Sequence, residues 1–144
     1  SLGATVALNP SKEDVVTAVK ERTENRGADV VVITAPNVKA LETGLNLCRK
    51  GGVVCVFAPT PPDVYVSISP YRMFFSEIKL VGSYSTSHLE TKVALELIKN
   101  RRIEARKLIS HRFPLNKINE AFKLASRDKN CLKVVITNGA EEDA

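Results

Sequence analysis

The sequence predicts a doubly wound α/β fold with a mostly parallel sheet, and three observations support this prediction. Residues 30–33 and 53–58 are apolar runs without polar alternation, which is typical of central strands covered on both faces. Between them, apolar residues recur at spacings of three, four and three, as on one face of a helix: Val38, Leu41, Leu45 and Cys48. Strands and helices also alternate along the chain, an order that produces parallel sheets.

The chain begins with a predicted strand and helix. Residues 5–8 form the strand, and Asn9-Pro10 stops it. Ser11 can cap the following helix, with Asp14 three residues later in the position of a capping box. The buried face of this helix consists of three valines, Val15, Val16 and Val19.

The two apolar strands and the helix between them form the central βαβ unit. Asn37 can cap the helix at its start, and Gly51 can end it. In open parallel sheets, ligands bind just beyond the carboxyl ends of the strands. We therefore expect the functional site near Thr34-Ala35-Pro36 and Ala58-Pro59-Thr60.

The middle of the chain adds two strands and a helix. Residues 64–68 alternate between apolar and polar, the pattern of a strand with one exposed face. Residues 79–84 form the next strand. Ser87 and Glu90 have the spacing of a second capping box and open a helix.

The last forty residues return as another helix and strand. Residues 118–125 have helical spacing of their apolar residues, and residues 132–136 form the final strand. We expect residues 139–144 to be a flexible tail.

Composition narrows the class of protein. The chain has 144 residues, of which 44% are hydrophobic and 26% charged, as in ordinary globular proteins. No apolar run approaches the roughly 20 residues that span a bilayer, and no basic segment followed by an apolar one opens the chain, so we expect neither a membrane span nor a signal peptide.

Three cysteines without metal-ligand spacing favour reduced thiols in a cytoplasmic protein. The net charge of +5 is dispersed and lacks interleaved aromatic residues, which argues against nucleic-acid binding.

One expected motif is absent. Nucleotide-binding sheets of this kind begin with a strand, a Gly-x-Gly-x-x-Gly turn and a helix that binds pyrophosphate. None of the seven glycines has that spacing, and the chain starts at what corresponds to the middle of such a domain. The predicted fold is therefore a partial Rossmann fold without its first strand and glycine-rich turn.

Several segments occur together in an order that resembles a known family. They are Leu2-Gly3-Ala4, Gly27-Ala28-Asp29-Val30-Val31, Leu80-Val81-Gly82-Ser83, and His111-Arg112-Phe113-Pro114-Leu115 followed by Asn119-Glu120-Ala121-Phe122. The sequence resembles the coenzyme-binding half of the medium-chain, zinc-dependent alcohol and polyol dehydrogenases over almost its whole length.

The resemblance implies a domain organisation and an activity. Residues 1–107 correspond to a partial dinucleotide-binding domain, and residues 108–138 to a returning segment that packs toward a catalytic domain outside this chain. The implied reaction transfers a hydride between NAD or NADP and an alcohol or polyol, with zinc held by residues outside this chain. The implied assembly is a homo-oligomer that pairs through Val64–Ser69.

The resemblance also implies which residues contact the cofactor. They follow the three strands of the dinucleotide-binding part or open the last strand: Thr34 and Ala35, Phe57 and Ala58, Ser83, Tyr84 and Ser85, and Lys133. No catalytic residue and no metal ligand are expected within the chain. The candidates for such roles, Cys48, Cys55, Cys131, His88 and His111, fall on separate elements.

Two alternatives remain open at this stage. One is a methyltransferase-like or other nucleotide-binding α/β domain, because such domains also place Gly-Gly-Val-Val before a central strand. The other is a zinc-free quinone reductase of the same dehydrogenase family. The final helix and strand favour the dehydrogenases over the first alternative.

Overall fold

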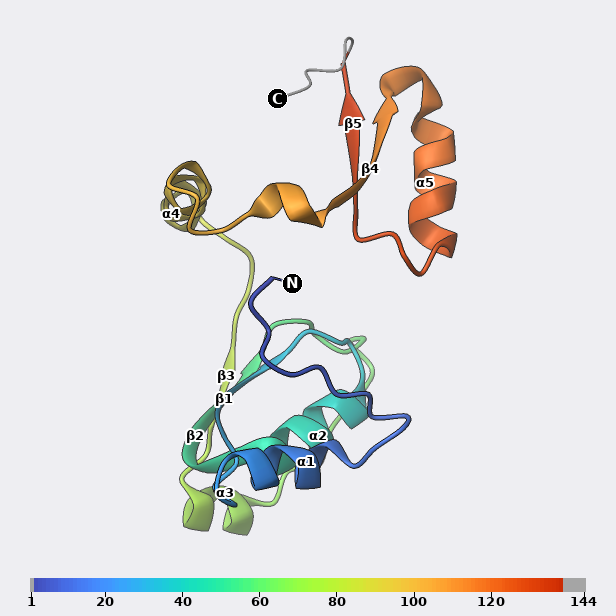
Figure 1. The fold of residues 1–144 in the computed structure, drawn as a ribbon. Helices are drawn as coiled ribbons and strands as arrows, with labels where there is room; N and C mark the ends of the chain where they lie inside the picture. Colours follow the sequence, from blue (N-terminus) through green and yellow to red (C-terminus); the bar gives the residue numbers. More distant parts are fainter. Residues whose placement is uncertain (1, 139–144) are drawn as a thin grey trace. The chain divides into compact units, whose positions relative to one another are not determined.

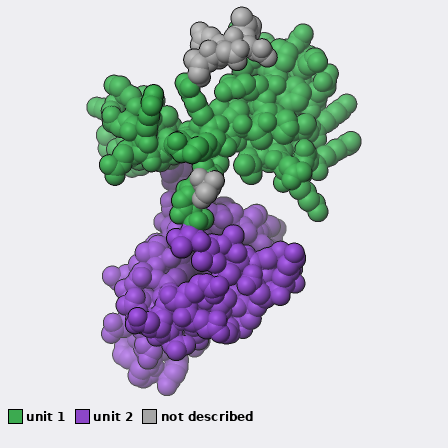
Figure 2. Space-filling model, in the orientation of Figure 1, with its two compact units in different colours: residues 1–4, 86–144 green, residues 5–85 purple. Residues whose placement is uncertain are grey.

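The structure is a computed structural model that describes residues 2–138, and it contains helices and parallel strands (Figure 1). The chain divides into two compact units. One is Thr5–Ser85, and the other runs from Thr86 onward and includes the first four residues (Figure 2). The tail that we expected at residues 139–144 lies outside the described residues, and the predicted domain boundary after residue 107 stays a prediction.

The first unit is built on a three-stranded sheet. β1 (Ala28–Ile33), β2 (Cys48–Val56) and β3 (Lys79–Gly82) lie in the order β1-β2-β3, and both pairs are parallel. The α/β class with parallel strands is thereby confirmed. The prediction that β1 is a central strand is wrong, because β1 is at the edge and Val30 and Val32 are 60% and 53% exposed.

The core of this unit lies between the sheet and its helices. α2 (Val38–Leu47) packs against β1 and β2, α1 (Val15–Arg22) packs against α2, and α3 (Pro70–Ser76) contacts β2. The buried residues of the cluster are apolar and come from both strands and helices, together with one residue just before β3: Ile33, Leu41, Leu45, Val54 and Ile78. This packing supports the sheet whose strand ends form the candidate site.

The first helix begins later than predicted. The N-cap of α1 is Asp14, whose side chain accepts hydrogen bonds from the amides of Val16 and Thr17. Ser11 does not cap the helix, because its amide donates to the Asn9 side chain within a preceding turn. Asp14 therefore takes the capping role that we had assigned to Ser11, as an acidic N-cap can.

The second helix confirms one predicted boundary and corrects the other. Asn37 caps α2 and accepts a hydrogen bond from the amide of Ala40 at 2.8 Å. Gly51 does not end the helix, since α2 stops at Leu47 and β2 begins at the next residue. Gly51 instead lies within β2 with φ +70°, where the register with β1 shifts. A left-handed residue at a strand irregularity is a usual place for glycine.

Two predicted strands do not form among the described residues. Residues 5–8 and residues 64–68 have no regular secondary structure and pair with no described strand. A strand needs a neighbour to satisfy its amides and carbonyls, and hydrophobic pattern alone does not supply one. The alternation in the second segment is nevertheless real, because Val66 and Ile68 pack against the core while Tyr65 is exposed.

The second unit contains a helix, followed by two parallel strands with another helix between them. α4 (His88–Lys99) opens with the predicted capping box between Ser87 and Glu90. Two short 3₁₀ helices, η1 (Ala105–Leu108) and η2 (Leu115–Lys117), flank β4 (Ile109–Pro114). β4 pairs in parallel with β5 (Lys133–Thr137), and α5 (Ile118–Arg127) packs against β5. No helix in the described part of the chain is long and apolar enough to cross a membrane.

Candidate functional site

The carboxyl ends of the three parallel strands meet at one edge of the first sheet. Ile33 pairs with Val56, and Val56 pairs with Gly82, so the last residues of the three strands are in register. Thr34, Phe57 and Ser83 follow directly, and all three are exposed. The structure thereby brings together three of the four residue groups that we predicted to contact a cofactor.

Backbone hydrogen bonds hold the segments that leave these strands. The amides of Phe57 and Ala58 both donate to the carbonyl of Ile33, at 3.0 and 2.9 Å. The amide of Ser83 donates to the carbonyl of Val56 at 3.0 Å. These three amides are therefore engaged within the protein. A ligand at this edge would therefore contact the side chains and carbonyls of Phe57, Ala58 and Ser83, or the backbone after these residues.

The backbone after β3 has an unusual conformation. Ser85 has φ +54°, a left-handed conformation that few residues other than glycine adopt. Tyr84 is 98% exposed. Within the described residues, the amides of Tyr84 and Ser85 donate no backbone hydrogen bond outside regular elements. Both amides can therefore donate to an acceptor near this edge.

A cavity of about 660 Å³ lies beside the end of β1. Its walls come from β1, α1, α2 and the segment before α1, and they include Thr34 and Ala35. Most of the lining is apolar, and Lys39 near the start of α2 adds a cation. Sequence reasoning missed Lys39. Its position could have been inferred from the sequence, because Lys39 lies two residues after the Asn37 N-cap. A helix that follows the end of a strand presents its amino end to ligands at that edge of the sheet.

Lys133 is the fourth predicted group. It is the first residue of β5, and its side chain is exposed. Lys133 belongs to the compact unit that begins at Thr86, whereas the three strand ends belong to the other unit. Its contact with a cofactor stays a prediction.

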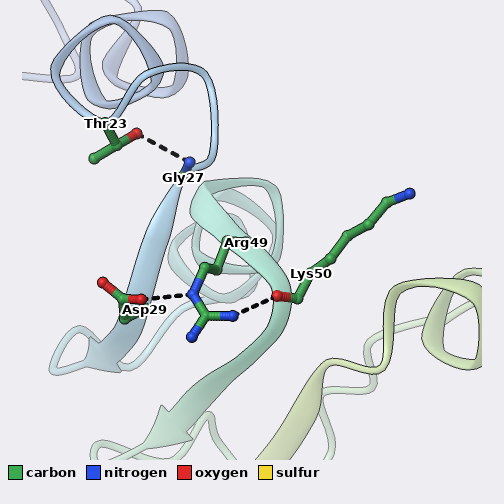
Figure 3. Close-up of polar contacts among 5 residues, drawn as sticks. All are labelled: Thr23, Gly27, Asp29, Arg49 and Lys50. Carbon is green, nitrogen blue, oxygen red and sulfur yellow. Dashed lines mark hydrogen bonds and ion pairs between the residues drawn. The ribbon is translucent and has the colours of Figure 1, made fainter.

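The opposite, amino-terminal edge of the sheet is held by structural polar contacts (Figure 3). The Arg49 guanidinium pairs with Asp29 and donates to the carbonyl of Lys50, while the Gly27 amide donates to the Thr23 hydroxyl. The hydrogen bond from Arg49 lowers the pKa of the Asp29 carboxyl. This pair joins β1 to β2 and lies at the end away from the candidate site, so we assign it no ligand role.

The candidate metal ligands do not converge. Cys48 opens β2 and does not lie on the helix face where we expected it, and burial raises the pKa of its thiol. His88 opens α4, and His111 lies in β4. Among residues 2–138, no three His, Cys, Asp or Glu side chains come close enough together to hold a metal ion.

Comparison with known proteins identifies the family. The model of a family described as "Zinc-binding dehydrogenase" matches residues 1–100. The chain belongs to this family. The resemblance found in the sequence is confirmed, and the methyltransferase-like alternative is set aside.

The curated relatives of the chain are named for different substrates. An L-threonine 3-dehydrogenase from Caldanaerobacter subterraneus subsp. tengcongensis is 33% identical over 137 residues, covering 94% of this chain and 39% of the relative. A sorbitol dehydrogenase from Halalkalibacterium halodurans is 28% identical, with coverage of 94% and 39%. The chain thus spans about two fifths of the length of these curated family members.

A solved structure of a zinc-binding dehydrogenase from Sinorhizobium meliloti 1021, bound to NADP, has the same fold. Its TM-score is 0.81 at 28% identity, and the match covers 94% of this chain and 40% of that one. The parallel strands of this chain are therefore arranged as in the matched part of that NADP-bound structure.

Proposed function

We propose that this chain is the nicotinamide-facing part of an NAD- or NADP-dependent dehydrogenase that acts on an alcohol or polyol in the cytoplasm. The observation that carries the proposal is the register of the three strand ends, which places Thr34, Phe57 and Ser83 side by side at one edge. In open parallel sheets this edge binds the ligand. Membership of the family and the NADP-bound relative support a nicotinamide cofactor as that ligand.

The residues at this edge fit the nicotinamide half of the cofactor. Phe57 and Ala58 offer an exposed ring and a small side chain along which a flat ring could lie, and Phe57 is 62% exposed. The amides of Tyr84 and Ser85 could donate to a carboxamide. The cofactor, when bound, supplies the carbon that takes or gives the hydride. The role of this chain is to hold the ring and orient it.

The residues present do not fit a catalytic zinc ion. Such an ion needs three protein ligands and an open position, and the described residues offer no such group. We propose that the zinc ligands belong to residues outside this chain. The chain would then depend on those residues to polarise the alcohol oxygen, and alone it would be inactive.

Titration with NADP or NAD, monitored by amide NMR shifts of the 144-residue chain, tests the cofactor proposal. We expect shifts at residues 34–35, 57–58 and 83–85 with a dissociation constant in the millimolar range, since a micromolar site needs about 8 kcal/mol and the glycine-rich turn is absent. Phe57→Ala should weaken binding about fivefold, because an aromatic contact contributes about 1 kcal/mol. Phe122→Ala, which removes a comparably exposed ring from α5, is the matched control.

Four results would contradict these proposals. Shifts confined to the amino-terminal edge around Arg49, or an equal effect of both Phe variants, would show that the strand ends do not bind the cofactor. Stoichiometric zinc after dialysis, or alcohol-dependent reduction of NAD or NADP by the chain, would show that it carries its own catalytic site.

We also propose that the protein is a homo-oligomer that pairs through Val64–Ser69. This segment has no regular secondary structure and pairs with no described strand, although the Val64 amide donates to the carbonyl of Pro61. A backbone that lacks a strand partner can pair with that of a second copy. Next to it, α3 exposes a group of rings in contact with one another, one pair tilted and one edge-to-face: Tyr71, Phe74 and Phe75. The apolar residues Val66 and Ile68 pack against the core and would not form the contact themselves.

Sedimentation velocity at micromolar concentration should show a dimer or a larger assembly. Ser67→Pro removes one amide of the segment, and Phe74→Lys places a charge among the rings, so each should shift the protein toward the monomer. Phe122→Lys changes a ring of similar exposure on α5 and should leave the assembly intact. A wild-type protein that is monomeric throughout this range would refute the proposed pairing.

A further inference from the structure

The pairing of β4 with β5 is interrupted at Ser110. Ile109 pairs with Lys133, but His111 pairs with Val134, so the two residues after Ile109 are matched by only one residue after Lys133. This is the count that defines a β-bulge, which is rare between parallel strands. Bulges commonly redirect a neighbouring side chain, and here the affected neighbour is the first residue of β5.

The Ser110 hydroxyl supplies hydrogen bonds at this irregularity. Its Oγ accepts from the amides of Leu132 and Lys133, at 3.0 and 3.3 Å, and can donate to the carbonyl of Lys133 at 3.2 Å. One side chain on β4 is therefore within hydrogen-bonding distance of both backbone groups of Lys133. That arrangement restrains the peptide planes on both sides of the lysine Cα, and with them the direction of its side chain.

The hydrogen-bonding capacity of a hydroxyl suits this position. A serine Oγ accepts two hydrogen bonds and donates one. The two amides fill the acceptor sites, and the donated proton has three acceptors within reach. They are the Lys133 carbonyl, the His111 Nδ1 at 3.0 Å and the Cys131 Sγ at 3.9 Å. A methyl group in its place would remove the two accepted hydrogen bonds and the donated one.

We propose that Ser110 is a positioning residue that aims the Lys133 ammonium at a diphosphate group. The inference rests on the cofactor contact predicted for Lys133 in the proposed dehydrogenase and extends it, since it names the residue through which that contact is set. Lys133 is exposed and hence accessible to an anion. An ammonium is a point charge on a flexible stem, so its contribution depends on where its backbone directs it.

Titration of the 144-residue chain with inorganic pyrophosphate, followed by the NMR shifts of the backbone amides around residue 133, tests the inference. Lys133→Met should weaken binding about tenfold, the loss expected for one charge-assisted contact. Ser110→Val should weaken binding about fivefold. Ser110→Thr has the same shape as the valine variant but keeps the hydroxyl, so it should retain wild-type affinity. In the Lys133→Met background, Ser110→Val should have no further effect.

Ser110→Ala provides a second hydroxyl-free variant, and Ser126→Ala is the matched control. Ser126 also donates to a backbone carbonyl, but within α5. If Lys133→Met weakens binding and neither hydroxyl-free variant does, Ser110 does not position the lysine, although the cofactor role of Lys133 stands. If Lys133→Met has no effect, both that role and the inference are overturned. Equal losses by Ser110→Val with and without Lys133 would also overturn the inference.

Discussion

Replacing Gly27 with alanine should lower the free energy of unfolding of the first unit by about 4 kcal/mol, because strain and overpacking act together. Gly27 has φ +94°, a conformation that L-residues other than glycine rarely adopt. An added Cβ would lie 2.7 Å from the carbonyl oxygen of Leu47, at the end of α2. That oxygen is a backbone atom, so relief of the contact requires movement of the junction between α2 and β2.

The unfolding midpoint in urea, measured by circular dichroism, gives the effect. Gly51→Ala is the control, because Gly51 also has a positive φ (+70°) but an added Cβ there would meet only the Arg49 side chain, at 3.4 Å. We expect it to cost about 1 kcal/mol from strain alone. Equal effects of the two variants would show that the approach of Gly27 to Leu47 does not limit stability.

Truncating Val54 should lower the free energy of unfolding by about 3 kcal/mol, from lost transfer free energy and a cavity. Val54 lies in the central strand β2 and is the largest residue that is fully buried among the described ones, at 0% exposure. It belongs to the cluster that joins α2 to the sheet. A Val54→Ala variant would leave space that this packed cluster fills only in part.

Val30→Ala is the matched control, since it is the same substitution on the adjacent strand at a side chain that is 60% exposed. Its cost should remain below about 1 kcal/mol. Urea titrations of both variants under one set of conditions provide the comparison. A loss at Val30 as large as that at Val54 would mean that other atoms cover the exposed face of β1 in solution.

Local signals in the sequence identified most helices correctly. The Asn37 cap, the capping box of Ser87 and Glu90, and the apolar spacing of α5 were all found because such signals act between residues three or four apart. The same reasoning misplaced the start of α1, because both Ser11 and Asp14 are capping residues. Only the turn around Asn9 decided between them.

Strand formation was predicted less well, because a strand is defined by a partner that can be distant in the chain. In residues 64–68, Val66 and Ile68 pack against the core as the alternation predicted, but Val64 is exposed and no described strand pairs with the segment. Likewise, the apolar run of β1 predicted a strand covered on both faces, whereas β1 is at an edge and exposes Val30 and Val32.

The sequence by itself determined the α/β class, the parallel order of the strands and the family, since these depend on periodicity and on motifs contiguous in the chain. It also identified the segments after β1, β2 and β3 as the candidate site. Only the tertiary structure decided that Ile33, Val56 and Gly82 are in register, that Lys39 lines the neighbouring cavity and that Ser110 binds the backbone of Lys133. The reason is physical: each of these facts depends on contacts between residues far apart in the chain, which packing creates and local pattern does not encode.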